Sequence, residues 1–310
     1  MNRRKFLSSS IASTAIMMQS LDTIAAPLSA TAPANGFGLK VLATNWGFEG
    51  SLDAYCKKAK ATGYDGIEIW WPNNAASQDE LFGALKTYDL AVAFLTAGHE
   101  PKFDAHFASF KKMVDAAAGN TRQKPLVINC HSGKDFYTYE QNKTIVDYTL
   151  RLAVQSGIKI CHETHRSRML YAAPVARRFF ETIPDMRITL DISHWCNVHE
   201  SLLGDQPETV ALAIQRADHI HARVGHAEGP QVNDPRAPEW KAAVAAHFNW
   251  WDKIVAIKKA NGETLTVLTE FGPPDYMPTE PYTRKPLANQ WEINVHMMQL
   301  LRKRILESKK

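Results

Sequence analysis

Residues 157–168 read GIKICHETHRSR, and the interpretation of the whole chain depends on this stretch. Within it, His162-Glu163-Thr164-His165 is one residue short of the His-Glu-x-x-His motif of zinc proteases. That motif needs two histidines four apart on one helix face, whereas His162 and His165 are three apart. The preceding β-branched run predicts a buried strand ending near Glu163, with neighbouring side chains on opposite faces. The stretch therefore predicts one inward carboxylate at a strand end, and an outward His162.

Along the chain, short apolar runs alternate with longer stretches that show helical periodicity. Predicted strands are 39–45, 65–71, 90–95, 125–130, 158–163, 186–191, 217–222 and 264–270, and predicted helices are 51–62, 77–87, 101–118, 139–156, 167–182, 206–216, 237–260 and 287–306. Near-continuous apolar strands are typical of a parallel sheet covered by helices. This pattern predicts an α/β fold, a (β/α)8 TIM barrel forming a single domain over residues 35–310. The alternative, an open doubly wound sheet, usually has a Gly-rich phosphate loop, which TNWGFEG after the first strand lacks.

The first 34 residues form a separate segment. Residues 3–7, RRKFL, precede the small apolar stretch SSSIASTAIMM, and together they resemble a twin-arginine export signal. Small residues at 32–34 predict cleavage before Asn35. The apolar stretch is too short and too rich in Ser and Thr for a stable membrane anchor. We therefore expect a periplasmic or otherwise exported protein.

Composition limits the classes of partner. Without residues 1–34 the chain loses three basic residues and one acidic residue, so its formal charge falls from +4 to +2. A near-neutral chain without basic runs argues against a nucleic-acid partner. The cysteines are too few for a disulfide scaffold and contain no Cys-x-x-Cys, which predicts free, buried thiols. They are Cys56, Cys130, Cys161 and Cys196.

Polar residues close four consecutive predicted strands. Glu163 ends the fifth, Asp191 the sixth and Glu270 the eighth, and the seventh carries His219 and His221. Active sites of such barrels lie at the C-terminal strand ends, and a lone charge in an apolar run is costly. Three carboxylates and one imidazole suit Mn²⁺, Mg²⁺ or Co²⁺ better than a thiolate-type zinc site. We therefore expect a divalent metal here.

Residues after other strands predict a pocket for a sugar. Trp46 follows the first strand and His131 the fourth, while His165 and Arg166 lie just past the fifth, and Trp195 follows the sixth. Aromatic faces suit the C–H faces of a sugar, and polar tips suit its hydroxyl groups. We predict that these five side chains bind substrate.

The order Glu, Asp-x-x-His, His-x-His, Glu on the last four strands resembles the xylose-isomerase-like TIM-barrel superfamily. This superfamily includes sugar phosphate isomerases and epimerases and the AP-endonuclease-2-like family, and the resemblance covers residues 38–305. It implies that Glu163, Asp191, His221 and Glu270 hold the metal, and that His194 contacts substrate or supports a ligand. Mn²⁺ is the expected ion, with Mg²⁺, Co²⁺ and Zn²⁺ as alternatives.

The substrate pocket departs from the ketose 3-epimerases of that superfamily. Met169 stands where they have a second Glu, and Ala227 stands where they have an Arg. Arg223 and His226 lie nearby in a different register, and we predict that Arg223 binds substrate. The endonuclease branch needs an Asp-x-His pair, which the loop GHAEGPQ lacks. An export signal also does not fit a role in DNA repair.

The predicted function is that of a metal-dependent sugar isomerase or epimerase. It would act on a carbohydrate or polyol through an enediolate, with Glu163 and Glu270 as acid and base. The alternative is a metal-dependent lyase or dehydratase acting on keto-sugars or 3-keto-glycosides. A second alternative is a non-catalytic sugar-binding barrel, which would not need all four ligands. The expected partner is a small-molecule sugar or glycoside, and homo-oligomerisation is left open.

Overall fold

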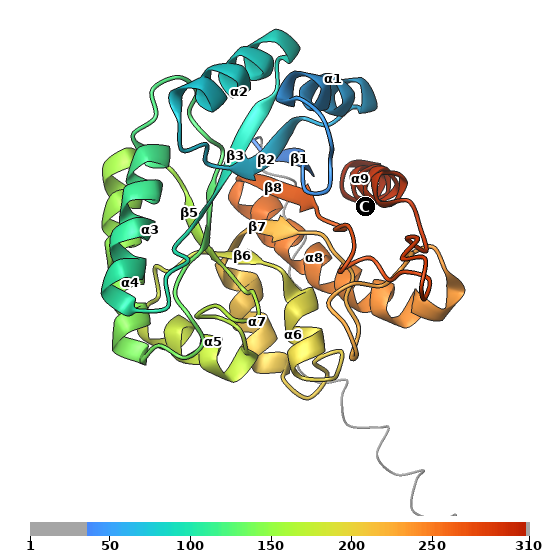
Figure 1. Cartoon of the computed structure of the whole chain (residues 1–310). Helices are drawn as coiled ribbons and strands as arrows, with labels where there is room; N and C mark the ends of the chain where they lie inside the picture. Colours follow the sequence, from blue (N-terminus) through green and yellow to red (C-terminus); the bar gives the residue numbers. More distant parts are fainter. Residues whose placement is uncertain (1–35, 308–310) are drawn as a thin grey trace, which may run out of the picture.

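Eight parallel strands close into a barrel at the centre of the molecule (Figure 1). The structure is a computed structural model and describes residues 36–307. The strands are β1 (Gly38–Thr44), β2 (Gly66–Trp70), β3 (Ala91–Ala97), β4 (Ile128–His131), β5 (Ile160–Glu163), β6 (Ile188–Leu190), β7 (Ala217–His221) and β8 (Thr264–Thr269). Each strand pairs with the next, and β8 closes the ring on β1. The predicted (β/α)8 barrel is confirmed.

Helices surround the strands on the outside of the barrel (Figure 1). They are α1 (Leu52–Thr62), α2 (Ala75–Tyr88), α3 (Phe103–Ala118), α4 (Tyr139–Ser156), α5 (Ala173–Thr182), α6 (Ile192–Val198), α7 (Pro207–Arg216), α8 (Lys241–Asn261) and α9 (Gln290–Glu307), with a 3₁₀ turn, η1 (Pro238–Trp240), before α8. Local sequence fixes several of their ends. Thr138 and Gln141, for example, form a capping box at the start of α4.

Two predictions after the fifth and sixth strands are wrong. The helix predicted over 167–182 begins at Ala173, because Ser167 takes a left-handed φ of 61° that no helix accepts. Helix α6 is absent from the prediction, since its seven residues are too few for helical periodicity to be seen. Asp191 caps this helix, accepting a hydrogen bond from the Ser193 N–H at 3.1 Å.

The apolar side chains form two separate layers. The larger layer fills the space between the strands and the helices. The smaller one lies inside the barrel and consists of Leu42, Ala93, Val127, Cys161 and Leu268. All four cysteines are free and buried, as predicted.

Inward side chains change from apolar to polar towards the C-terminal strand ends. On β5, Cys161 is followed on the same face by Glu163, and on β8, Leu268 is followed by Glu270. The packed interior therefore supports a polar centre at one end of the barrel.

None of the helices within residues 36–307 has the length and apolar character needed to cross a membrane. The predicted export signal, residues 1–34, lies outside the described residues.

Candidate metal centre

Four side chains meet at the C-terminal ends of β5 to β8. Glu163 ends β5, Asp191 follows β6, His221 ends β7 and Glu270 follows β8. One nitrogen or oxygen atom from each lies within 4.8 Å of one such atom of every other. All four residues are buried. These are the four residues that the sequence predicts as metal ligands, and the structure brings all of them together.

Strand alternation places Glu163 at this centre and turns the neighbouring His162 away from it. His162 points outward, where its Nδ1 lies 2.8 Å from Ser132 Oγ and its Nε2 lies 2.7 Å from Thr149 Oγ1 on α4. The predicted outward orientation of His162 is confirmed. Because the two histidines of HETH do not share a face, a protease-type zinc site is excluded here.

Three of the four residues turn towards one another an atom that lacks a well-oriented hydrogen bond. Glu163 Oε1, His221 Nδ1 and Glu270 Oε2 are buried without a well-oriented hydrogen bond. His221 Nδ1 lies 3.0 Å from Glu270 Oε2 and 3.6 Å from Glu163 Oε1. Ligand atoms that share one ion at about 2.1 Å lie roughly 3.0–3.5 Å apart. Since unpaired buried atoms are costly, this spacing fits a shared divalent cation.

Opposing charges shift the pKa values at this centre. Burial alone would raise the pKa of Glu163, but the charges of His131 and His221 lower it well below its ordinary value. Burial alone would lower the pKa of His221, but the carboxylates of Glu270 and Glu163 raise it well above its ordinary value. The carboxylates thus favour a positive charge between them. A divalent ion would supply that charge in place of the His221 proton.

Arg223 provides a fixed positive charge beside the centre. It is 1% exposed, its Nη2 contacts the Asp191 carboxylate, and its Nη1 lies 3.4 Å from Glu270 Oε2. The same Nη2 donates to His194 Nε2 at 2.8 Å, and Nε donates to Ser193 Oγ at 3.3 Å. Burial raises the pKa of Asp191 to about 6, although Arg223 lowers it. Arg223 therefore holds two of the carboxylates in place, and its contact with substrate stays a prediction.

A second buried network supports the centre from inside the barrel. Glu68, on β2, lies 2.7 Å from His219 Nε2 and 3.1 Å from His221 Nε2. Asn129, on β4, donates to Glu163 Oε2 at 2.7 Å and lies 3.3 Å from Glu68 Oε1. Glu68, His219 and His221 are close enough to hold a cation, but both histidines already bond to the Glu68 carboxylate. When Nε2 of His221 donates to Glu68, its Nδ1 is free to act as a ligand.

Tyr276 lies over the centre, and no sequence pattern selected it as a candidate site residue. Its ring centroid lies 4.6 Å from the Arg223 guanidinium and 4.7 Å from that of Arg166. The ring also lies 4.8 Å from Trp46, and the hydroxyl group lies 3.5 Å from His165 Nε2. Tyr276 belongs to the irregular segment between β8 and α9, where no periodic pattern marks a side chain as inward.

Two predicted substrate residues, His131 and His165, lie near Glu163. His131 Nε2 contacts the Glu163 carboxylate. The ring of His165 lies 4.9 Å from that of His131 and 4.0 Å from that of His194. Burial, with His131 nearby, lowers the pKa of His165 to about 3, so this ring is neutral at ordinary pH. His165 therefore offers a neutral donor and acceptor to a bound molecule.

The prediction that Trp195 binds substrate is wrong. Helix α6 turns His194 towards Arg223 and Trp195 away from the centre, into the layer between strands and helices. Trp195 is 0% exposed, and its Nε1 donates to the Leu170 carbonyl at 2.9 Å. It is a packing residue, and this orientation could not be derived without the unexpected helix.

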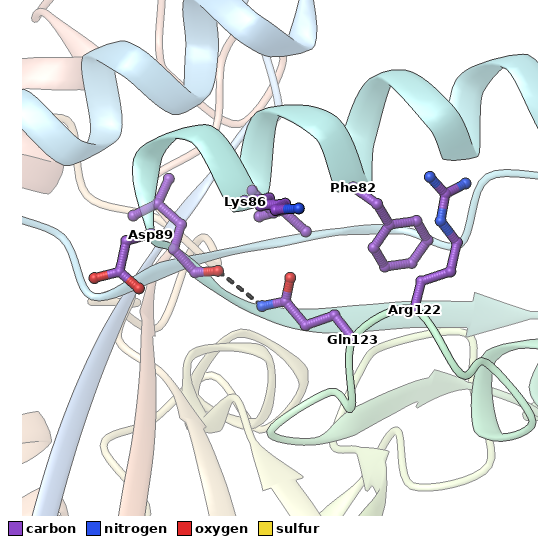
Figure 2. Close-up of a pocket in the computed structure, with 7 residues that line it drawn as sticks. Phe82, Lys86, Asp89, Arg122 and Gln123 are labelled. Atoms are coloured by element: carbon purple, nitrogen blue, oxygen red, sulfur yellow. Dashed lines mark hydrogen bonds between the residues drawn. The ribbon is translucent and has the colours of Figure 1, made fainter.

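Two surface cavities lie outside this centre, and none of its four residues lines either one. A cavity of about 490 Å³ lies between α2 and the segment before β4, where Gln123 Nε2 donates to the Leu90 carbonyl at 2.8 Å (Figure 2). Leu90 precedes β3, so this cavity is at the opposite end of the barrel from the strand ends described above. A cavity of about 560 Å³ is lined in part by Gly47 and Met277, the chain neighbours of Trp46 and Tyr276.

Comparison with known proteins places the fold. A family model described as "Xylose isomerase-like TIM barrel" matches residues 56–238. No curated protein matches the chain.

Solved structures match along nearly their whole length. They include 3-keto-D-glucoside 4-epimerase from E. coli (13% identity, 86% of this chain and 99% of that chain, TM-score 0.56). D-allulose 3-epimerase from Methylomonas sp. in complex with D-allulose also matches (16% identity, 87% of this chain and 99% of that chain, TM-score 0.56). The IOLI protein with a bound zinc atom matches as well (14% identity, 87% of this chain and 99% of that chain, TM-score 0.59). A probable dehydratase from Bacillus anthracis and an endonuclease IV from Thermus thermophilus share the fold as well. At these identities the likeness shows the fold alone.

Proposed function

The chain belongs to the xylose isomerase-like TIM barrel family, and we propose that it is a metal-dependent isomerase or epimerase of carbohydrates. The observation that carries this proposal is the close approach of three buried ligand-type atoms at the strand ends. Glu163 Oε1, His221 Nδ1 and Glu270 Oε2 are buried, close together and without well-oriented hydrogen bonds. A protein that only bound sugars would gain nothing from this costly arrangement.

We propose that Glu163, Asp191, His221 and Glu270 hold the ion. Three carboxylates and one imidazole without a thiolate favour a hard or borderline cation, and Mn²⁺ is the ion that we propose. When bound, such an ion polarises a carbonyl oxygen and stabilises the negative charge that forms when a neighbouring proton leaves.

The two glutamates are suited to move that proton. Asn129 and His131 hold Oε2 of Glu163, so its Oε1 has a fixed direction. Glu270 presents its Oε2, which lacks a well-oriented hydrogen bond, 3.0 Å from the same Nδ1 of His221 that faces Glu163. One carboxylate would remove the proton from the carbon beside the carbonyl, and the other would return a proton. Return to the opposite face of the same carbon gives an epimer, and return to the neighbouring carbon gives an isomer.

Aromatic side chains at the mouth of the centre support a sugar as substrate. Trp46 is 37% exposed and Trp70 is 41% exposed, so both indole rings are accessible to a ligand. Tyr276 lies against Trp46 and shields the carboxylates from water. Aromatic faces of this kind pack on the C–H faces of sugars, while His131 and His165 offer hydrogen bonds to hydroxyl groups.

A panel of sugars tests the proposal. Mn²⁺-loaded protein is incubated with ketoses, aldoses and 3-keto-glycosides, and the products are identified by NMR, with protein treated with a chelator as the control. We expect an epimer or isomer of at least one sugar that forms only with the metal. An elimination product would instead make the protein a lyase. Binding without conversion of any sugar would make it a non-catalytic sugar-binding barrel.

A further inference from the structure

Three cationic side chains stand near the mouth of the centre without a carboxylate partner. Lys134 follows β4, and Arg166 and Arg168 follow β5. All three are only partly exposed. Within residues 36–307, no Asp or Glu oxygen lies within 4.0 Å of their charged nitrogens. Partly buried charges are usually paired with an opposite charge. These three cations would therefore be stabilised by a negatively charged group that the chain itself does not provide.

The local structure holds the backbone of the first of these residues, Lys134, in place. The Lys134 N–H donates to Asn142 Oδ1 at 3.3 Å, and Asn142 Nδ2 donates back to the Lys134 carbonyl at 2.9 Å. Gly133, with a φ of 69°, makes this close approach possible, because a Cβ there would lie 2.3 Å from Asn142 Oδ1. The loop is therefore shaped before any ligand binds.

The guanidinium of Arg168 is held by the backbone at the end of β3. Its Nη1 donates to the Gly98 carbonyl at the end of β3, at 3.4 Å, and its Nε is buried without a hydrogen bond. This guanidinium thus keeps unused donors next to the strand ends. A carboxylate or phosphate group is the usual partner for such a fork of donors.

The two charges are close enough to disfavour each other. Burial lowers the pKa of Lys134, and the charge of Arg168 lowers it further. Asp135 and Glu100 oppose this effect, but the Glu100 carboxylate already accepts hydrogen bonds from Ser109 Oγ and the His99 N–H. Like charges kept close together, with Glu100 engaged elsewhere, are typical of a site for an anion.

An aromatic surface connects these cations with the metal centre. Trp70 lies 5.4 Å from the ring of His131, which contacts Glu163, and 6.1 Å from the ring of His99. His99 lies on the side of the cations, because after burial the charges of Arg168 and Lys134 are the main causes that lower its pKa. One bound molecule could therefore lie along Trp70 and reach both places.

We propose that the substrate is an anionic sugar whose carboxylate or phosphate group binds Lys134 and Arg168 while its reacting carbons lie at Glu163. This inference rests on the proposed function and narrows its substrate class. Neutral sugars would leave the two cations unpaired and would bind more weakly.

Matched sugars test the charge preference by calorimetry with the Mn²⁺-loaded protein. D-fructose is compared with D-fructose 6-phosphate, and D-glucose with D-glucuronate, so that the two pairs distinguish a phosphate from a carboxylate. We expect at least one anionic sugar to bind tenfold or more tightly than its neutral counterpart, with an affinity that falls as salt rises. Equal affinities within both pairs would overturn the inference.

Variants test which residues cause the preference for anionic sugars. Lys134→Gln and Arg168→Gln should each weaken binding of the anionic sugar tenfold or more and leave the neutral sugar unchanged, and Arg168→Lys should restore part of the loss. Lys143→Gln, which removes a cation paired with Asp147 at 2.8 Å on α4, is the matched control and should change neither. Equal weakening of both sugars by Lys134→Gln would contradict the assignment.

Uptake of solvent deuterium into these sugars reports the proposed function separately. Uptake without a charge preference would overturn this inference alone. A charge preference without uptake into any sugar would support the anion site and overturn the proposed isomerase activity.

Discussion

His221 and Glu68 face each other across the barrel interior, with Nε2 of the imidazole 3.1 Å from Oε1 of the carboxylate. Both side chains are fully buried. When Nε2 carries the proton, it donates to the Glu68 carboxylate. Nδ1, which has no well-oriented hydrogen bond, then faces Glu163 and Glu270 as a possible metal ligand. A histidine that ligates a metal is commonly oriented by a carboxylate in this way.

Replacement of Glu68 by Gln should weaken Mn²⁺ binding about 10- to 100-fold, because the oriented carboxylate behind His221 is lost. Calorimetric titration of the metal-free variant with Mn²⁺ measures this change. Glu239→Gln, at an exposed position in the 3₁₀ turn before α8, is the control and should bind as the parent does. Equal Mn²⁺ affinity in Glu68→Gln would show that Glu68 has only a packing role.

Loss of the Tyr276 ring should reduce turnover without loss of the metal. Tyr276→Ala opens the cover over Arg223 and lets water reach the carboxylates, so we expect turnover to fall about tenfold or more. Tyr276→Phe keeps the ring and should stay within a few-fold, because the hydroxyl group is 3.5 Å from its nearest partner, His165 Nε2. Steady-state rates and the metal content of each variant are measured together. Metal loss in Tyr276→Ala would contradict a role limited to covering the site.

Acid should destabilise the fold through His247. This buried ring on α8 accepts from the Gly225 N–H at 3.1 Å and donates to the Ala243 carbonyl at 2.8 Å. Burial lowers its pKa from 6.5 to about 4, so the unfolded chain takes up the proton first. Its stabilising contribution is complete above about pH 6.5 and declines as the pH falls towards 4.

Urea unfolding at pH 7.5 and pH 5 tests this dependence. Between these values the parent should lose about 2 kcal/mol more unfolding free energy than His247→Gln, whose side chain does not titrate. The same loss in both proteins would show that His247 does not carry the effect.

The export signal, which we propose for residues 1–34, is tested in cells. Replacement of Arg3 and Arg4 by Lys should keep the protein in the cytoplasm, since such signals depend on the arginine pair. Fractionation and the N-terminal sequence of the mature parent, expected to begin at Asn35, measure the outcome. Export of the Lys variant at the parent level would contradict the proposal.

Strand alternation made much of the centre predictable from sequence. A side chain at a strand end has only two faces to choose between, so the inward Glu163 fixes the outward His162. The apolar run before each strand end fixes its depth in the barrel. These two rules place Asp191, His221 and Glu270 at the same end of the barrel, as the structure shows.

Residues outside regular strands escaped the same reasoning. Tyr276 lies in an irregular segment, where neither period nor polarity indicates direction. Helix α6 is too short to show a period, so Trp195 was assigned to the wrong side. The contact between Glu68 and His221 was missed for another reason. The two residues are 153 positions apart in the sequence, and only closure of the barrel brings them together.

The central claim is that one buried carboxylate both holds the metal and moves a proton, and solvent exchange measures this most directly. Sugars converted in the panel are incubated in D₂O with the Mn²⁺-loaded parent, with metal-free parent and with Glu163→Gln, and deuterium uptake at carbon is followed by NMR. We predict uptake only with the metal-loaded parent, and neither tight Mn²⁺ binding nor uptake with Glu163→Gln. His162→Gln, which alters only the outward neighbour, should stay within a few-fold of the parent. Metal-independent uptake, or full activity in Glu163→Gln, would contradict the account.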